Sequence, residues 1–129
     1  MAKGYDKHIL RQQQVAGLGK QLARRAKSKC ELCGAQAKLK VMELTPLPEE
    51  PDPDSALLLC QSCQSYAHDK RPKLQPTAMQ FLRDSVWSEV EPAQILAIRL
   101  TRKLSSNGES WAQSILEDLY VDPSIEQRL

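Results

Sequence analysis

Two short motifs, Cys30-Glu31-Leu32-Cys33-Gly34 and Cys60-Gln61-Ser62-Cys63, decide how this chain of 129 residues folds. In each motif two residues separate the cysteines, so one tight turn can direct both sulfurs at a single ion. Four thiolates presented in this way are the tetrahedral ligand set of a structural zinc site. The spacing therefore predicts that all four cysteines bind one zinc ion.

Two other interpretations of the cysteines, unrelated buried thiols and redox motifs, fit the chain less well. Redox C-x-x-C motifs usually occur once, in a βαβ setting that is absent from this sequence. Residues 1–8 contain no apolar segment of a secretory signal, and the longest apolar run, residues 56–60, is too short to span a membrane. We therefore expect a cytoplasmic protein with no membrane association, in a compartment that keeps thiols reduced.

The charges are distributed unevenly along the chain. Residues 1–40 carry a net charge of +8 and residues 41–69 a net charge of −6, while residues 70–129 are balanced, so the total of +2 hides the asymmetry. The basic segment contains a cluster that comprises Lys20, Arg24, Arg25, Lys27 and Lys29. Two interpretations of this cluster remain open: a solvated face beside the metal site, or a surface that binds nucleic acid or a protein partner.

The predicted fold is α+β. Hydrophobic residues make up 41% of the chain and charged residues 26%, which excludes a collagen or a fully disordered chain. We expect a small four-cysteine module of the zinc-ribbon or treble-clef type with a short β-hairpin, preceded by a basic helix and followed by a C-terminal helical bundle. The boundaries are 1–28 for the basic helix with a frayed start, 29–71 for the zinc module and 72–129 for the helical segment.

Periodicity supports the basic helix. Apolar residues recur on one face, whereas Lys20, Arg24 and Lys27 fall on the opposite face. Because Gly17 and Gly19 each cost about 1 kcal/mol inside a helix, the helix is expected to be firm only from Lys20 onward. The apolar face comprises Val15, Leu18, Leu22 and Ala26.

The zinc module is expected to hold two strands, at residues 38–44 and 56–59. The loop between them has four prolines and four acids, so it cannot join a β-ladder. The second cysteine pair runs into residues 64–70, which can be helical until Pro72. A cysteine pair at the start of a helix favours a treble clef over a zinc ribbon.

The remaining sequence predicts helices. Helices are expected from Pro76, from Pro92 to about Leu104, after a capping box formed by Ser106 and Glu109 to about Tyr120, and from Asp122-Pro123. Trp87 and Trp111 are large apolar groups among small aliphatic residues, and both are predicted to anchor the core.

The order of these elements resembles the treble clef of the HNH nucleases. That family usually has paired histidines at the end of the first strand and a histidine just after the last cysteine. The matching positions here hold Met42, Glu43 and Gln64, so the general base and a metal ligand would be missing. His68 lies one helical turn after Gln64; it is either a substitute ligand or a surface residue.

A second resemblance covers residues 25–124. The segment Arg25-Ala26-Lys27-Ser28-Lys29-Cys30-Glu31-Leu32-Cys33-Gly34 is similar to the start of the zinc domain of the PhnA family, which is named for an alkylphosphonate-uptake operon. The segments Val86-Trp87-Ser88-Glu89-Val90 and Trp111-Ala112-Gln113 resemble later motifs of that family. Membership would imply a zinc-binding module, and it implies no particular reaction.

The sequence favours a module without catalysis. It contains no G-x-S-x-G motif, no glycine loop that cradles phosphate and no metal centre with histidine ligands. We therefore expect a zinc-binding module that binds nucleic acid or a protein. The alternative is a divergent HNH-type nuclease or an enzyme of phosphonate metabolism, with Glu43, His68 and Asp69 around a second metal ion.

Overall fold

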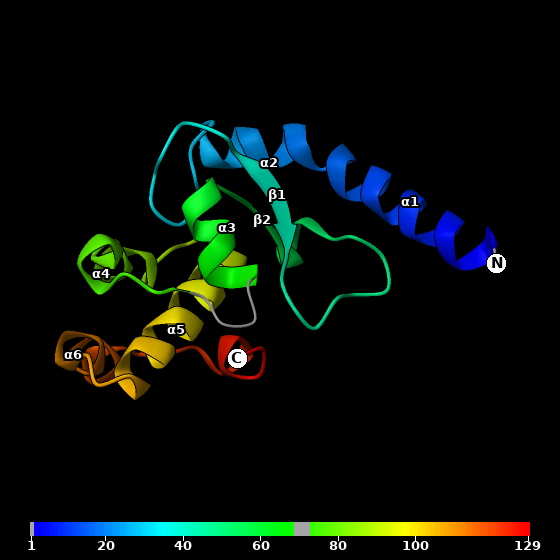
Figure 1. Ribbon diagram of the computed structural model, residues 1–129. Helices are drawn as coiled ribbons and strands as arrows, with labels where there is room; N and C mark the ends of the chain where they lie inside the picture. The colour runs from blue at the N-terminus through cyan, green and yellow to red at the C-terminus, as the bar shows by residue number, and fades with distance from the viewer. Residues whose placement is uncertain (1, 69–72) are drawn as a thin grey trace.

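The structure is a computed structural model that describes residues 2–68 and 73–129, and it confirms the α+β class (Figure 1). In the described residues, no helix is both long enough and apolar enough to cross a membrane. The elements in chain order are α1 (Ala2–Gly17), α2 (Gly19–Ala26), β1 (Lys40–Glu43), β2 (Ala56–Leu59), α3 (Gln61–His68), α4 (Leu82–Ser85), α5 (Glu91–Ser106), α6 (Ser110–Asp118) and α7 (Pro123–Glu126), with 3-10 turns at Pro53–Ser55 and Pro76–Met79.

The β-hairpin lies between two hydrophobic clusters. Strands β1 and β2 pair antiparallel, with Lys40 opposite Leu59, and every residue of β2 is buried. Successive side chains of a strand point to opposite faces. Leu57 and Leu59 accordingly pack in the main core with α5, whereas Ala56 and Leu58 pack with Leu22 of α2. The hairpin is thus covered on both faces, which a two-stranded sheet needs for stability.

Helix α5 is the centre of the main core. It packs against α4, α6, α3 and β2, and it begins with Pro92 among its first residues as predicted. Its inward residues are almost wholly shielded from solvent; they include Ala93, Ile95, Leu96, Ala97, Ile98, Leu100 and Leu104.

The N-terminal helix is longer than predicted. Helix α1 begins at Ala2 rather than after a frayed segment, and α2 follows it with only Leu18 between them. Leu18 keeps right-handed helical angles, and its carbonyl accepts from the Leu22 N–H at 2.9 Å. The glycines thus fall at the junction of two helices rather than in a helix interior, where their cost would be larger. The predicted faces are confirmed, because Leu22 is buried while Lys20 and Arg24 are exposed.

The predicted capping box is wrong. Helix α5 continues through Ser106, and Glu109 stands at the N-cap of α6 without a side-chain capping bond. Gly108 adopts a φ of 96°, and the Glu109 N–H donates to the Leu104 carbonyl at 3.0 Å. This left-handed glycine ends α5 and moves the start of the next helix to Ser110. The final cap is confirmed: Asp122 accepts from the Ser124 N–H at 2.9 Å.

The two tryptophans differ in burial. Trp111 packs partly buried against the core, with the Arg83 guanidinium 5.3 Å from its ring centroid. Trp87 is 53% exposed, so its predicted role as a core anchor is wrong. Val86, its neighbour at the end of α4, takes the inward position and is fully buried.

A buried ion pair fastens α2 to the hairpin. The Arg25 guanidinium donates from Nε and Nη2 to the two carboxylate oxygens of Glu31, both at 2.7 Å. Glu31 Oε1 also accepts from the Leu58 N–H at 2.9 Å, and Arg25 donates further to the carbonyls of Pro53 and Ala56. The Glu31 side chain is only 2% exposed, so its charge depends on Arg25 for compensation.

Arg11 repeats this arrangement at the other end of the loop. Its guanidinium donates to both oxygens of Glu43, at 3.0 and 2.8 Å, and to the carbonyls of Pro48 and Glu49. The acidic loop, residues 44–55, is therefore held through its backbone. Among the described residues, its carboxylates form no ion pair with the basic cluster.

We predict that Arg25→Gln lowers the free energy of unfolding by about 3–5 kcal/mol, because it leaves the Glu31 carboxylate buried without a compensating cation. The double variant Arg25→Gln/Glu31→Gln should be more stable than this single variant. The second change removes the charge and keeps an oxygen for the Leu58 N–H. Urea unfolding followed by circular dichroism measures both. A double variant as unstable as the sum of its two single variants would contradict the pairing.

Candidate metal centre

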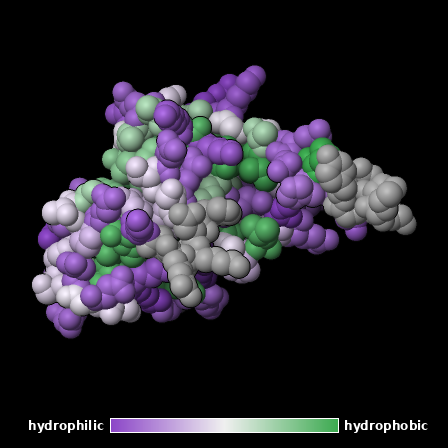
Figure 2. All heavy atoms as spheres, in the orientation of Figure 1, coloured by the Kyte–Doolittle hydropathy of each residue, from purple (hydrophilic) through white to green (hydrophobic). Residues whose placement is uncertain are grey.

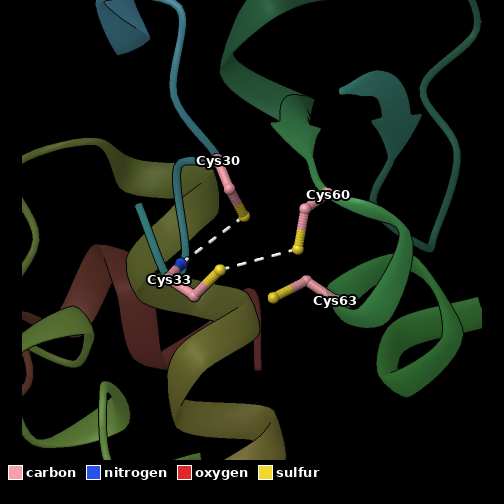
Figure 3. Close-up of side chains that lie close together, drawn as sticks. All are labelled: Cys30, Cys33, Cys60 and Cys63. Carbon is pink, nitrogen blue, oxygen red and sulfur yellow. Dashed lines mark hydrogen bonds between the residues drawn. The ribbon is translucent and has the colours of Figure 1, made fainter. Parts of the chain in front are cut away.

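The four cysteine side chains converge on one point from two segments of the chain (Figure 3). Their sulfur atoms all lie within 4.8 Å of one another, and Cys33 Sγ is 3.5 Å from Cys60 Sγ. Sulfurs placed tetrahedrally at about 2.3 Å from a zinc ion would be about 3.8 Å apart. The cluster therefore has the size and the ligand chemistry of a four-thiolate zinc site.

The first cysteine pair lies in a tight turn after α2. The Gly34 N–H donates to the Cys30 carbonyl at 2.9 Å, and the Cys30 N–H donates to the Ala35 carbonyl at 2.7 Å. The Cys33 N–H is directed at Cys30 Sγ at 3.4 Å, which stabilises negative charge on that sulfur. Gly34 has a φ of 86°, a conformation that residues with a side chain rarely adopt.

The second pair lies at the start of a helix, as the sequence predicted. Cys60 directly follows β2, and Cys63 is in the first turn of α3. The Gln64 N–H donates to the Cys60 carbonyl at 3.0 Å, which closes this turn.

The cluster is sealed from solvent by its neighbours. Cys30, Cys60 and Cys63 are buried, and Cys33 is partly buried against the same core. The Ser85 hydroxyl donates to the Leu32 carbonyl at 2.7 Å, and this bond ties the first turn to α4. The sulfurs are thus held by the hairpin on one side and by the C-terminal helices on the other.

The crowded thiols cannot all ionise without a cation. A hydrogen bond from Cys63 lowers the pKa of Cys30 to about 4, while that same bond, together with burial, raises the pKa of Cys63. Burial is the main cause that raises the pKa of Cys33 to about 11. The Cys30 thiolate is therefore favoured, whereas the Cys33 and Cys63 thiols stay protonated. A divalent cation supplies the charge that stabilises four thiolates together.

The other predicted site residues are spread over the surface. Lys20, Arg24, Lys27 and Lys29 are exposed, and within the described residues none forms an ion pair. Arg25, which the sequence placed with them, instead binds Glu31 and loop carbonyls inside the fold. The basic cluster is therefore reduced to four exposed cations.

One of the two carboxylates of the predicted second metal site, that of Glu43, is already paired. Both oxygens of Glu43 are bound by Arg11, which competes with any cation for them. Asp69 and the side chain of His68 lie outside the described part of the chain. In the described part, the four cysteines are the group of Cys, His, Asp or Glu residues that meets the geometry of a metal site.

The sequence analysis missed the roles of Glu31 and Arg11. Glu31 lies between two cysteines of the first motif, where a solvated side chain would be the ordinary expectation. The signal that could have revealed it is an acid inside a strongly basic segment, since an isolated carboxylate there has cations within reach.

Comparison of the chain with protein-family models, curated proteins and solved structures finds no match.

We predict that the purified protein holds one zinc ion per chain and that Cys33→Ser releases it. Because a structural zinc site contributes on the order of 10 kcal/mol to folding, residues 29–68 should lose their structure, whereas α5 and α6 retain their own packing. Metal analysis and amide exchange measure the two effects. Ser62→Ala, an exposed change between Cys60 and Cys63, is the matched control and should keep the metal. Full zinc occupancy in the Cys33 variant would contradict this site.

Proposed function

We propose that the protein is a non-catalytic zinc-binding module whose ion is part of the fold. The observation that carries this proposal is the convergence of four buried or partly buried sulfurs from two turns. Four thiolates complete the tetrahedral shell of zinc, so the ion keeps no open position for water or a substrate. A reducing compartment such as the cytoplasm would keep all four thiols available for the metal.

The treble clef is the zinc fold that we favour for the module. It is supported by a first pair in a glycine-containing turn, a hairpin between the pairs and a second pair at the start of α3. The resemblance to the PhnA family, which rests on the first motif and on the segments around Trp87 and Trp111, accords with this arrangement. We therefore propose a PhnA-like zinc module that acts by binding a partner, either nucleic acid or protein.

Nuclease chemistry finds little support at the positions where the HNH pattern places its reactive groups. Metal-dependent phosphodiester cleavage needs an open metal position and a base that activates water. Glu43 is engaged by Arg11, and Met42 offers no ligand of the kind that hard cations prefer. The Gln64 amide donates to the Leu59 carbonyl at 2.8 Å and so takes a structural role.

We predict that zinc-loaded protein does not cleave supercoiled plasmid in the presence of Mg²⁺, Mn²⁺ or Ni²⁺. The assay is run beside the double variant Glu43→Gln/His68→Ala, with zinc content measured on both samples. Cleavage by the wild type that disappears in the double variant would contradict the non-catalytic proposal. Cleavage that persists at equal rate in both would come from a contaminating nuclease, and a further purification step should remove it.

A further inference from the structure

Helices α1 and α2 form an arm that extends from the body of the protein (Figure 1). The 25 residues from Ala2 to Ala26 would span about 37 Å at the rise of an α-helix. The α2 end is fixed to the body by Arg25 and by Leu22, and α1 is fixed mainly through Arg11. Most of the surface of α1 therefore has no partner within the described fold.

Among the described side chains of the arm, residues 7–26, the exposed charge has one sign. Arg11 and Arg25 are neutralised by Glu43 and Glu31 respectively, and neither carboxylate is available to the outer face. The cations that remain exposed without an ion pair, among the described side chains of residues 7–29, are Lys7, Lys20, Arg24, Lys27 and Lys29.

The exposed cations of α2 repel one another, and a negatively charged partner would offset this repulsion. Lys20 and Arg24 lie four residues apart on one stripe of α2, and Lys27 follows directly after the helix as its left-handed C-cap. Like charges at this spacing destabilise a helix by about 0.2–0.5 kcal/mol per pair. Figure 2 shows the hydrophilic side chains that project over α2. Negative charges of a bound partner would turn this repulsion into attraction.

Over its described side chains, residues 7–26, the arm lacks the apolar stripe that a protein groove would require. Leu10 is the large apolar side chain that residues 7–17 of α1 expose, at 54%, and Ile9 is half-buried. Gln12, Gln13 and Gln14 are exposed and offer amide donors and acceptors instead. A face of cations and amides matches a polyanion that also presents hydrogen-bonding groups.

We propose that the arm binds double-stranded DNA, with the α2 cations on phosphates and α1 in the major groove. An α-helix is about 10–12 Å across and fits the B-form major groove, which is about 12 Å wide. The major groove of duplex RNA is too narrow for side-chain readout, and single strands are usually held by stacking on aromatic rings. No Phe, Tyr or Trp occurs between positions 7 and 65, so this part of the arm offers none of the large rings on which bases stack.

This inference rests on the proposed zinc module, because Arg25 ties α2 to Glu31 within the first cysteine motif. Glutamines of α1 can pair with adenine edges, while the cations supply affinity that does not depend on sequence. The salt dependence of binding therefore reports on the α2 stripe.

The test measures binding of zinc-loaded protein to a mixed-sequence DNA duplex longer than one helical turn. If Lys20, Arg24, Lys27 and Lys29 each contact a phosphate, the slope of log K against log salt is about −3.6, a loss of about 150-fold between about 50 and 200 mM salt. The variant Lys20→Gln/Arg24→Gln/Lys27→Gln should reduce the slope to about −0.9, a loss of about 3.5-fold over the same range.

The matched control is Lys73→Gln/Arg102→Gln/Lys103→Gln, which removes the same charges from exposed positions outside the arm. It should keep the wild-type slope, and duplex DNA should bind more tightly than duplex RNA or single strands. No binding to duplex DNA at low salt, tighter binding of RNA or single strands, or an equal loss in the control would overturn the inference. A zinc-free but folded preparation would instead contradict the proposed module, and zinc content measured on each sample separates the two outcomes.

Discussion

The convergence of four cysteine sulfurs on one buried point is the constraint on which the rest of the structure depends. It joins the turn after α2 to the start of α3, and the hairpin β1–β2 lies between these two points. A two-stranded hairpin is marginal by itself. Here one of its faces reaches the core around α5 and the other covers Leu22 of α2. The four sulfurs thus fix the hairpin, and the hairpin in turn fixes the position of the arm through Leu22.

Charge pairing connects this point to the arm. Glu31 lies between Cys30 and Cys33, and its carboxylate binds Arg25 of α2 and the Leu58 N–H of β2. Burial of a carboxylate is costly unless a cation lies against it. Arg11 holds α1 to β1 in the same way, because its guanidinium donates to both carboxylate oxygens of Glu43. Two of the basic residues therefore serve the fold, and the exposed cations that remain are available to a partner.

Local sequence signals predicted the convergence of the four cysteines, both strands, the position of α5 and the Asp122 cap, because each depends on spacing or on a single residue. The extent of α1 was not predictable from local sequence signals. It depends on Leu18, which keeps helical angles between two glycines, and on the contact of Arg11 with Glu43, 32 residues further along the chain. The exposure of Trp87 likewise depends on which residue after α4 turns inward, and that residue is Val86. Arg25 was misassigned because its partner, though near in sequence, is buried by β2.

Titration of metal-free, reduced protein with Zn²⁺, followed by circular dichroism and by the amide resonances of residues 29–68, tests the central claim most directly. The account predicts that this segment lacks its native resonances without metal and gains them in proportion to added zinc, with saturation at one ion per chain. The same native resonances in the metal-free protein, unchanged by zinc, would contradict the claim that the four sulfurs organise the fold through a metal ion.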